Sequence, residues 1–162
     1  MANIAIGTAP EVLVTDGSSN RLPYPGSCHC GSVTVAFGIT GPLADLPLGR
    51  CECSFCRRHG ARTVTDAGGA LVIRAKAGAL HRYRFGLRIT DMLLYTECGV
   101  NVAALITHEG QDYATLNSNV LDCRDSLDTA PLLASYGGET AEARIARRLA
   151  KWTPARLEIA DG

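Results

Sequence analysis

The chain has 162 residues, a length that suits one domain with its own hydrophobic core. Hydrophobic residues make up 46% and charged residues 20%, which is typical of a folded globular protein and excludes a disordered chain. Lys and Arg number 16, as do Asp and Glu, so the formal net charge is zero. Proteins that neutralise phosphates usually carry a basic excess, so this balance argues against nucleic acid as a partner.

The N-terminal stretch MANIAIGTAPEVLVTDGSSN has no basic start and no long apolar run, so we expect no signal peptide. No segment approaches the roughly 20 apolar residues that a membrane-spanning helix needs, and we expect no membrane partner. These features predict a reducing, cytoplasmic location, where cysteines serve metal binding or catalysis before disulfides. The odd number of cysteines, 7, also argues against a fully paired disulfide framework.

Residues 1–23 predict an N-terminal arm, because they hold one short apolar run at 12–14 and then the turn-rich DGSSNRLPYPGS. Residues 24–162 predict a single domain. In its first part, Val33, Val35 and Phe37 alternate with smaller or polar residues, the period-2 pattern of a half-buried strand.

Further short β segments follow the cysteine-rich stretch CECSFCRRHGAR, separated by Gly, Lys or Asp turns. They are residues 70–74, 81–85, 92–95, 100–106 and 113–121. One helix is predicted over about 139–152, because Ala141, Ile145, Leu149 and Trp152 recur at helical spacing. Pro154 then ends it. The pattern predicts a mainly β domain with a C-terminal helix.

The cysteines concentrate in GSCHCGS at 26–32, CECSFC at 51–56 and YTECGV at 95–100. Two C-x-C pairs, one of them extended to C-x-C-x-x-C, are rarer by chance than a single C-x-x-C. On a strand, residues i and i+2 share a face, so each C-x-C pair can direct both thiols at one ion. Thiolates suit zinc, which is borderline-soft and accepts tetrahedral geometry.

A structural zinc site takes four protein ligands, whereas a catalytic site takes three and leaves one position open. Cys51, Cys53 and Cys56 therefore predict an open site, in which zinc would hold a thiol substrate as thiolate. The alternative is a closed knot in which these residues join Cys28, Cys30 or Cys98. Iron–sulfur ligation is disfavoured by the spacing.

The motifs GSCHCGSVTVAF, CECSFCRRHGA and a later Cys-Gly before a β run resemble the glutathione-dependent formaldehyde-activating enzyme family, which also includes centromere protein V. The resemblance covers roughly residues 24–110, and SYGGETAEARIARRLAKWTP resembles the endings of some bacterial members. It implies a tent-like, Mss4-like fold built from small antiparallel β sheets, with two zinc sites. It implies catalytic zinc at Cys51, Cys53 and Cys56, and structural zinc at Cys28, Cys30 and a later C-x-x-C pair.

The chain departs from that family at the later pair, where Tyr95 stands in place of a cysteine and only Cys98 remains. Three outcomes are open for the fourth structural ligand: Cys123, water or a nearby side chain such as Thr96, or no structural zinc at all. The other interpretation of Cys123 is a free buried cysteine that packs as a small hydrophobe.

His59 follows the three catalytic ligands and is a candidate proton shuttle for addition of a thiol to a carbonyl, or a residue of a solvated turn. The basic face of the helix has the same two readings, attraction of an acidic substrate or a solvated surface. That face comprises Arg144, Arg147, Arg148 and Lys151.

The leading hypothesis is a carbon–sulfur lyase that joins a thiol such as glutathione to an aldehyde such as formaldehyde, as the resemblance implies. A zinc ion with three thiolates is a weak Lewis acid, better suited to organising a thiolate than to making hydroxide. The alternatives are a non-catalytic zinc module that binds a macromolecule and a thiol or metal sensor. A homo-oligomer is left open.

Overall fold

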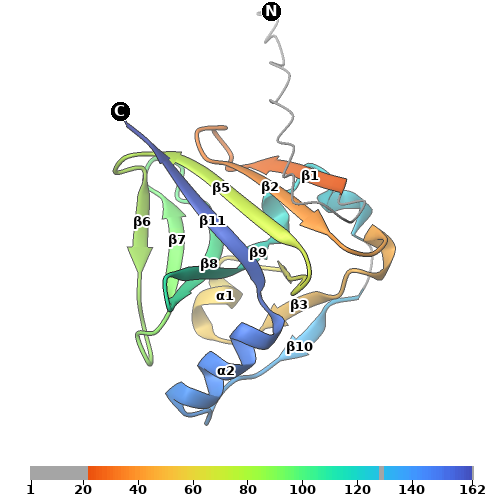
Figure 1. Ribbon diagram of the computed structural model, residues 1–162, viewed down its shortest axis with the longest axis vertical. Helices are drawn as coiled ribbons and strands as arrows, with labels where there is room; N and C mark the ends of the chain where they lie inside the picture. The colour runs from red at the N-terminus through yellow and green to blue at the C-terminus, as the bar shows by residue number, and fades with distance from the viewer. Residues whose placement is uncertain (1–21, 128–129, 162) are drawn as a thin grey trace, which may run out of the picture.

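A computed structural model of the chain describes residues 22–127 and 130–161 (Figure 1). The predicted N-terminal arm therefore lies outside the described residues, apart from Leu22 and Pro23, which begin the first strand. No helix in these two ranges combines the length and apolar character needed to cross a membrane.

Eleven strands and two α-helices make up the described part, with three short 3-10 turns between them. The strands are β1 (Leu22–Ser27), β2 (Thr34–Ile39), β3 (Leu48–Cys51), β4 (Thr63–Val64), β5 (Ala70–Lys76), β6 (Leu80–Tyr83), β7 (Asp91–Tyr95), β8 (Asn101–His108), β9 (Gln111–Asn117), β10 (Leu132–Ala134) and β11 (Thr153–Ala160). The helices are α1 (Ser54–Arg58) and α2 (Ala141–Lys151). The predicted mainly β class is confirmed, and so is the helix near the C-terminus.

All eleven strands belong to one branched sheet, in the order β1-β2-β5-β11-β9-β4-β3-β10, with β8, β7 and β6 continuing from β9. Strand β9 makes the branch, since β8 pairs along one edge while β11 and β4 share the other. The sheet is mixed, because β10 runs parallel to β3 and β11 runs parallel to β5. The strands thus form one large mixed sheet, where the expectation was of small antiparallel sheets.

The parallel β11–β5 pair arises because α2 reverses the direction of the chain before the last strand (Figure 1). The helix begins at Thr140, whose hydroxyl accepts a hydrogen bond from the Ala143 amide at 3.2 Å. It ends at Trp152, which already has extended backbone angles, and Pro154 then lies within the strand. The sequence pattern predicted the helix and its end but missed the strand that follows.

The hydrophobic core is built from alternating inward side chains of the sheet. In β2, Val35, Phe37 and Ile39 are buried while the residues between them are more exposed, as the period-2 pattern predicted. Strand β8 instead shows a continuous buried run over its first six residues. It is covered on both faces, and the main core on one face includes Leu93 and Leu105. A smaller cluster around Met92 and Trp152 lies on the other.

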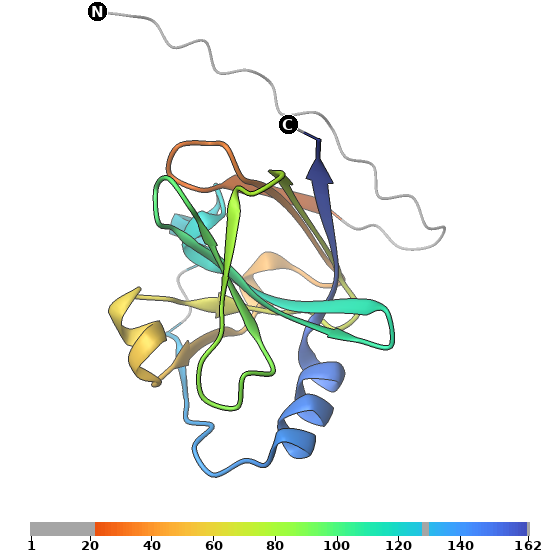
Figure 2. The ribbon, with the colours of Figure 1, turned by 90° about the vertical axis from the view of Figure 1, so that its left-hand side faces the viewer.

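Figure 2 shows the hairpin of β6 and β7 reaching down between α1 and α2. Side-chain contacts hold it on both sides. Tyr83 and Phe85 stack on Phe55 of α1, with ring centroids 5.7 and 5.4 Å apart. On the other side, Thr90 accepts a hydrogen bond from Arg148 of α2. The hairpin thus fixes the spacing of the two helices that flank the candidate site.

Candidate metal centre and adjoining cavity

The first cysteine group consists of Cys51, Cys53 and Cys56, whose sulfur atoms all lie within 4.8 Å of one another. Cys51 ends β3, Cys53 caps the N-terminus of α1, and Cys56 lies in the helix. The sharp change from strand to helix brings the three thiols together, so the pair Cys51 and Cys53 does not share a strand face as the sequence pattern predicted. The Cys56 amide donates a hydrogen bond to the Cys53 sulfur at 3.4 Å.

The three thiols are not electrostatically equivalent. A hydrogen bond from the Cys56 thiol lowers the pKa of Cys51 to about 5, against the effect of burial, and the charge of Arg144 contributes. The same hydrogen bond, together with burial, raises the pKa of Cys56 far above its ordinary value. The Cys51 thiolate is thus paired with the Cys56 thiol, which donates the hydrogen bond. A metal ion that binds here displaces the remaining thiol protons.

A zinc ion with thiolate ligands requires Zn–S distances of about 2.3 Å. Sulfur atoms within 4.8 Å of one another fit that requirement with little adjustment. No fourth cysteine, histidine or carboxylate in residues 22–127 and 130–161 joins the group within the same distance. The residues therefore fit a metal ion held by three protein ligands.

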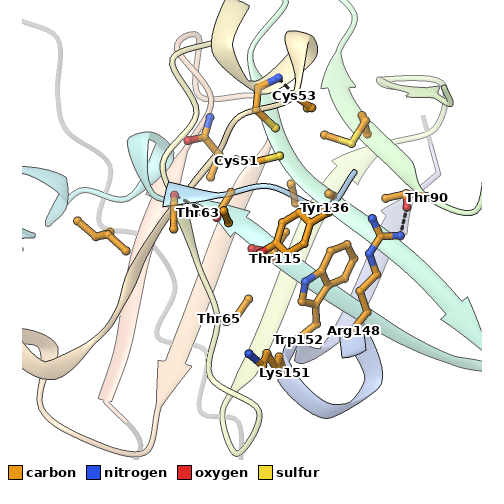
Figure 3. A pocket seen from close by; sticks show the side chains of 18 of the residues that line it. Cys51, Cys53, Thr63, Thr65, Thr90, Thr115, Tyr136, Arg148, Lys151 and Trp152 are labelled. Carbon is orange, nitrogen blue, oxygen red and sulfur yellow. Dashed lines mark hydrogen bonds between the residues drawn. The ribbon is translucent and has the colours of Figure 1, made fainter. Parts of the chain in front are cut away.

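A cavity of about 330 Å³ adjoins the first cysteine group, and we call it the first cavity. All three cysteines line it, together with side chains of β4, β7, β8, β9 and α2. Figure 3 shows Cys51 directed toward the Tyr136 ring, with Trp152, Arg148 and Lys151 below it in the view. The three cysteines therefore share one cavity with cationic and aromatic side chains.

Two arginines of α2 are paired with one carboxylate near the first cavity. Glu139 accepts hydrogen bonds from Arg147 at 2.7 and 3.0 Å and from Arg144 at 3.1 Å. The bonds from Arg147, followed by those from Arg144, lower the pKa of Glu139 to about 2. The Arg147 guanidinium also lies 3.7 Å from the centroid of the Tyr136 ring. These contacts place two positive charges close to Cys51.

Arg148 differs from its two neighbours because it contacts no carboxylate among the described residues. It lies over the Trp152 ring, 4.5 Å from the centroid, and donates to Thr90. Its Nε atom is buried and has no acceptor among the described residues. Burial, followed by repulsion from Arg147 and Arg144, lowers the pKa of Arg148 to about 10. Lys151 completes the cationic lining.

The second cysteine group consists of Cys28, Cys30 and Cys98, again with all sulfur atoms within 4.8 Å. Cys28 and Cys30 lie in the turn between β1 and β2, and their sulfur atoms are 3.6 Å apart. Gly31, with a φ of +79°, closes this turn by donating to the Cys28 carbonyl at 3.0 Å. Cys98 precedes Gly99 in the turn between β7 and β8. Two tight turns, rather than one strand face, therefore bring these thiols together.

The local environment divides the thiols of this group as well. Burial raises the pKa of Cys28, whereas hydrogen bonds with Ser32 lower the pKa of the exposed Cys30 to about 7. The Val33 amide donates to the Cys28 sulfur at 3.3 Å. A second cavity, of about 640 Å³, lies beside Cys28 and Cys98 and includes His59 and Asp122 in its lining.

The two groups are separate, so Cys51, Cys53 and Cys56 do not join Cys28, Cys30 or Cys98 in one closed knot. All seven cysteines are free, and Cys123 belongs to neither group but packs against the core. Tyr95 is buried in that core at the end of β7, where its backbone pairs with Val100. Tyr95 therefore packs in the core at the position where the resemblance implied a fourth cysteine.

His59 ends α1 and stacks on Phe55, with ring centroids 4.3 Å apart. It lines the second cavity and not the first, although it lies close in sequence to Cys56. None of the residues lining the first cavity is a histidine, aspartate or glutamate. Its ionisable lining, besides the cysteines, consists of Tyr136, Arg147, Arg148 and Lys151.

Sequence reasoning missed the contribution of the hairpin and of the segment before α2. Thr90 and Tyr136 line the first cavity, yet neither belongs to a recognisable motif. The periodicity of 139–152 gave one usable signal, because it placed the arginines away from the apolar stripe. It gave no means of separating Arg148 from Arg144 and Arg147.

Comparisons with known proteins place this fold among solved structures. No protein-family model matches the chain, and no curated protein matches it. The crystal structure of a Rhodobacter sphaeroides protein, a structural-genomics target, matches with a TM-score of 0.52 and 29% sequence identity. The match covers 68% of this chain and 99% of that chain. Fold and site together define a mostly β protein with two three-cysteine groups that can hold metal ions.

Proposed function

We propose that the protein is a zinc-dependent carbon–sulfur lyase resembling S-(hydroxymethyl)glutathione synthase, acting on a thiol such as glutathione and an aldehyde such as formaldehyde in the cytoplasm. The observation that carries the proposal is that Cys51, Cys53 and Cys56 form a three-thiol group facing the first cavity. Three protein ligands and an adjoining cavity are the arrangement of a zinc site that exchanges a ligand.

When bound at the first cysteine group, zinc supplies the ability to hold a substrate thiol as thiolate at neutral pH. In the reaction, the thiol sulfur bonds to the carbonyl carbon and the carbonyl π electrons move to oxygen. The proton that the thiol loses ends on that oxygen, which gives the S-hydroxymethyl adduct. The reverse sequence cleaves the same carbon–sulfur bond.

The residues of the first cavity support this addition by binding and by charge. Arg144 and Arg147 lie close enough to Cys51 for their charges to favour its thiolate, so they offset the negative charge of a metal with three thiolates. Trp152 and Met92 form an apolar floor that limits water around the reacting atoms. Tyr136 and Lys151 also line the cavity and can donate hydrogen bonds to the reacting oxygen.

The role of His59 as a proton shuttle stays a prediction. His59 lines the second cavity, whereas the substrate is proposed to bind in the first. Reaching a substrate in the first cavity would require a relay across α1. His59→Gln, which removes proton transfer, is expected to leave thiol binding unchanged.

Metal analysis tests the proposal directly. We expect two zinc ions per chain in the wild type, one in Cys53→Ser and two in the matched control Cys123→Ser. Zinc-loaded wild type should also form the glutathione–formaldehyde adduct faster than the uncatalysed reaction, as followed by NMR. A two-zinc protein that neither binds glutathione nor changes that rate would contradict the lyase and favour a binding module or a sensor.

A further inference from the structure

We infer that the first cavity contains an anion-binding subsite centred on Arg148, which receives a carboxylate of the ligand while the cysteine group receives its sulfur. The inference names a substrate class for the proposed function, a small thiol that carries a carboxylate. It rests on that function only for the sulfur end, because the anion-binding residues do not belong to the cysteine group.

The charge of Arg148 is not matched by a carboxylate among the described residues. A guanidinium presents five N–H donors and favours a planar, two-oxygen acceptor. Among the described residues, Arg148 has the Thr90 hydroxyl as a hydrogen-bond acceptor, and its buried Nε has none. A buried donor without a partner costs stability, and an arriving carboxylate removes that cost.

Arg148 differs from Arg144 and Arg147 in its hydrogen-bond partners. Arg144 and Arg147 are both held by Glu139, so their donors are committed to an internal carboxylate. Arg148 is held instead by neutral groups, the Trp152 ring and Thr90, which fix its direction without neutralising it. The burial that lowers its pKa to about 10 leaves it charged at neutral pH.

The lining of the first cavity carries positive charge without an acidic side chain. Arg147, Arg148 and Lys151 line it, and no aspartate or glutamate does. Glu139 is committed to Arg147 and Arg144, whereas Arg148 and Lys151 form no ion pair among the described residues. A ligand with both a thiolate and a carboxylate supplies the negative charges that these two cations lack.

Arg148 and the cysteine group lie where one ligand can reach both. Arg148 and Cys51 line the same cavity, with Tyr136 and Trp152 drawn between them in Figure 3. A volume of about 330 Å³ lies at the small end of the range for ligand sites, which suits a compact molecule. The ligand that matches these features has sulfur at one end, a carboxylate at the other and a short apolar spacer.

Two small thiols, one with a carboxylate and one with a hydroxyl, test the subsite. Zinc-loaded protein is titrated by calorimetry with 3-mercaptopropionate, which is anionic, and with 2-mercaptoethanol, which is neutral. We expect the anionic thiol to bind at least about tenfold more tightly, the range for a hydrogen bond to a charged group. In Arg148→Gln this preference should disappear, while the affinity for 2-mercaptoethanol stays unchanged. Arg156→Gln is the control, because that arginine lies exposed on β11 and pairs with Glu158.

Two further arms keep the inference and the proposed function apart. If thiols bind with equal affinity, the subsite is wrong and the lyase proposal stands. If no thiol binds but propionate stabilises the wild type and not Arg148→Gln, the subsite stands and the proposed function fails. Should Arg148→Gln fold poorly, Arg148→Lys keeps the charge but not the paired donors, and an undiminished preference in it overturns the inference.

Discussion

Cys98 is the residue that completes the second cysteine group from a distant part of the chain. Cys28 and Cys30 come from one turn, and Cys98 comes from another that Gly99 closes with a φ of +71°. The Gly99 amide donates to the Tyr95 carbonyl at 2.9 Å, so the turn is fixed by its own backbone. Loss of the Cys98 sulfur therefore removes a ligand without removing the turn.

Cys98→Ser is expected to lose one zinc ion per chain and to retain thiol binding at the first cysteine group, because the two groups are separate. Metal analysis gives the zinc content, and calorimetry with 2-mercaptoethanol reports the first site. Cys53→Ser should show the opposite pattern, with thiol binding lost. Loss of thiol binding in Cys98→Ser would mean that the second group supports the first.

Both cysteine groups could be predicted at the residue scale, because thiols at short spacing have few other uses in a globular domain. A shared strand face was predicted to bring each pair of thiols together. Instead, a strand-to-helix junction and two turns bring the sulfur atoms together. The place of His59 could not be predicted. Proximity to Cys56 in sequence does not say which side of a one-turn helix a side chain occupies.

At the scale of elements, the hairpin of β6 and β7 depends on a buried carboxylate at its loop end, where β7 begins. The Asp91 side chain is only 5% exposed and bonds Arg82 at 2.9 Å and also Arg84. Burial favours the protonated form, but hydrogen bonds from both arginines hold the pKa of Asp91 below its ordinary value. Thr90, the residue immediately before Asp91, accepts a hydrogen bond from Arg148, so the hairpin also positions the anion-binding subsite.

Asp91→Asn is expected to lower the free energy of unfolding by about 1–3 kcal/mol at pH 7, since the arginines lose a charged acceptor. Because the folded pKa of Asp91 is depressed, its contribution is full above the unfolded pKa of about 3.9 and is lost as pH falls through the folded value. Urea unfolding from pH 7 to pH 3 should therefore show the two proteins converging in acid. A constant difference across that range would contradict the ion pair as its cause.

Helix α2 is the second element on which the first cavity depends, and its N-terminal cap is a single hydroxyl. Thr140→Ala removes the acceptor for the Ala143 amide and should lower the free energy of unfolding by about 1 kcal/mol. Thr140→Ser, which keeps the hydroxyl, should retain most of it. Chemical denaturation of the two variants provides the measurement, and equal losses would show that the cap is not the cause.

At the scale of the whole molecule, the last strand joins two parts of the sheet. Strand β11 pairs with β5 over Ala155–Ala160 and with β9 over Thr153–Ala155, so it connects β2 and β1 to the rest of the sheet. The sequence pattern gave no sign of it. TPARLEIA has a proline at its second position and mixes charged and apolar residues, and its strand structure comes from partners about 40 and 80 residues away.

Removal of residues 153–162 is expected to abolish cooperative unfolding, because β5 and β9 each lose a partner and core side chains become exposed. Removal of residues 161–162 alone serves as the control and should leave the thermal transition nearly unchanged. Circular dichroism during heating provides the measurement. A sharp transition in the shorter chain would show that the remaining strands form a core by themselves.

The late position of β11 also orders events during synthesis. All six metal-binding candidates have left the ribosome once Cys98 has emerged, whereas β11 ends at Ala160, roughly 60 residues later. At about 5–20 residues per second, several seconds separate the two points. During that interval the thiols are in place on the nascent chain, but the helix that encloses the first cavity cannot yet dock. Metal acquisition can therefore precede closure of the cavity, with the cellular zinc supply reaching an open site.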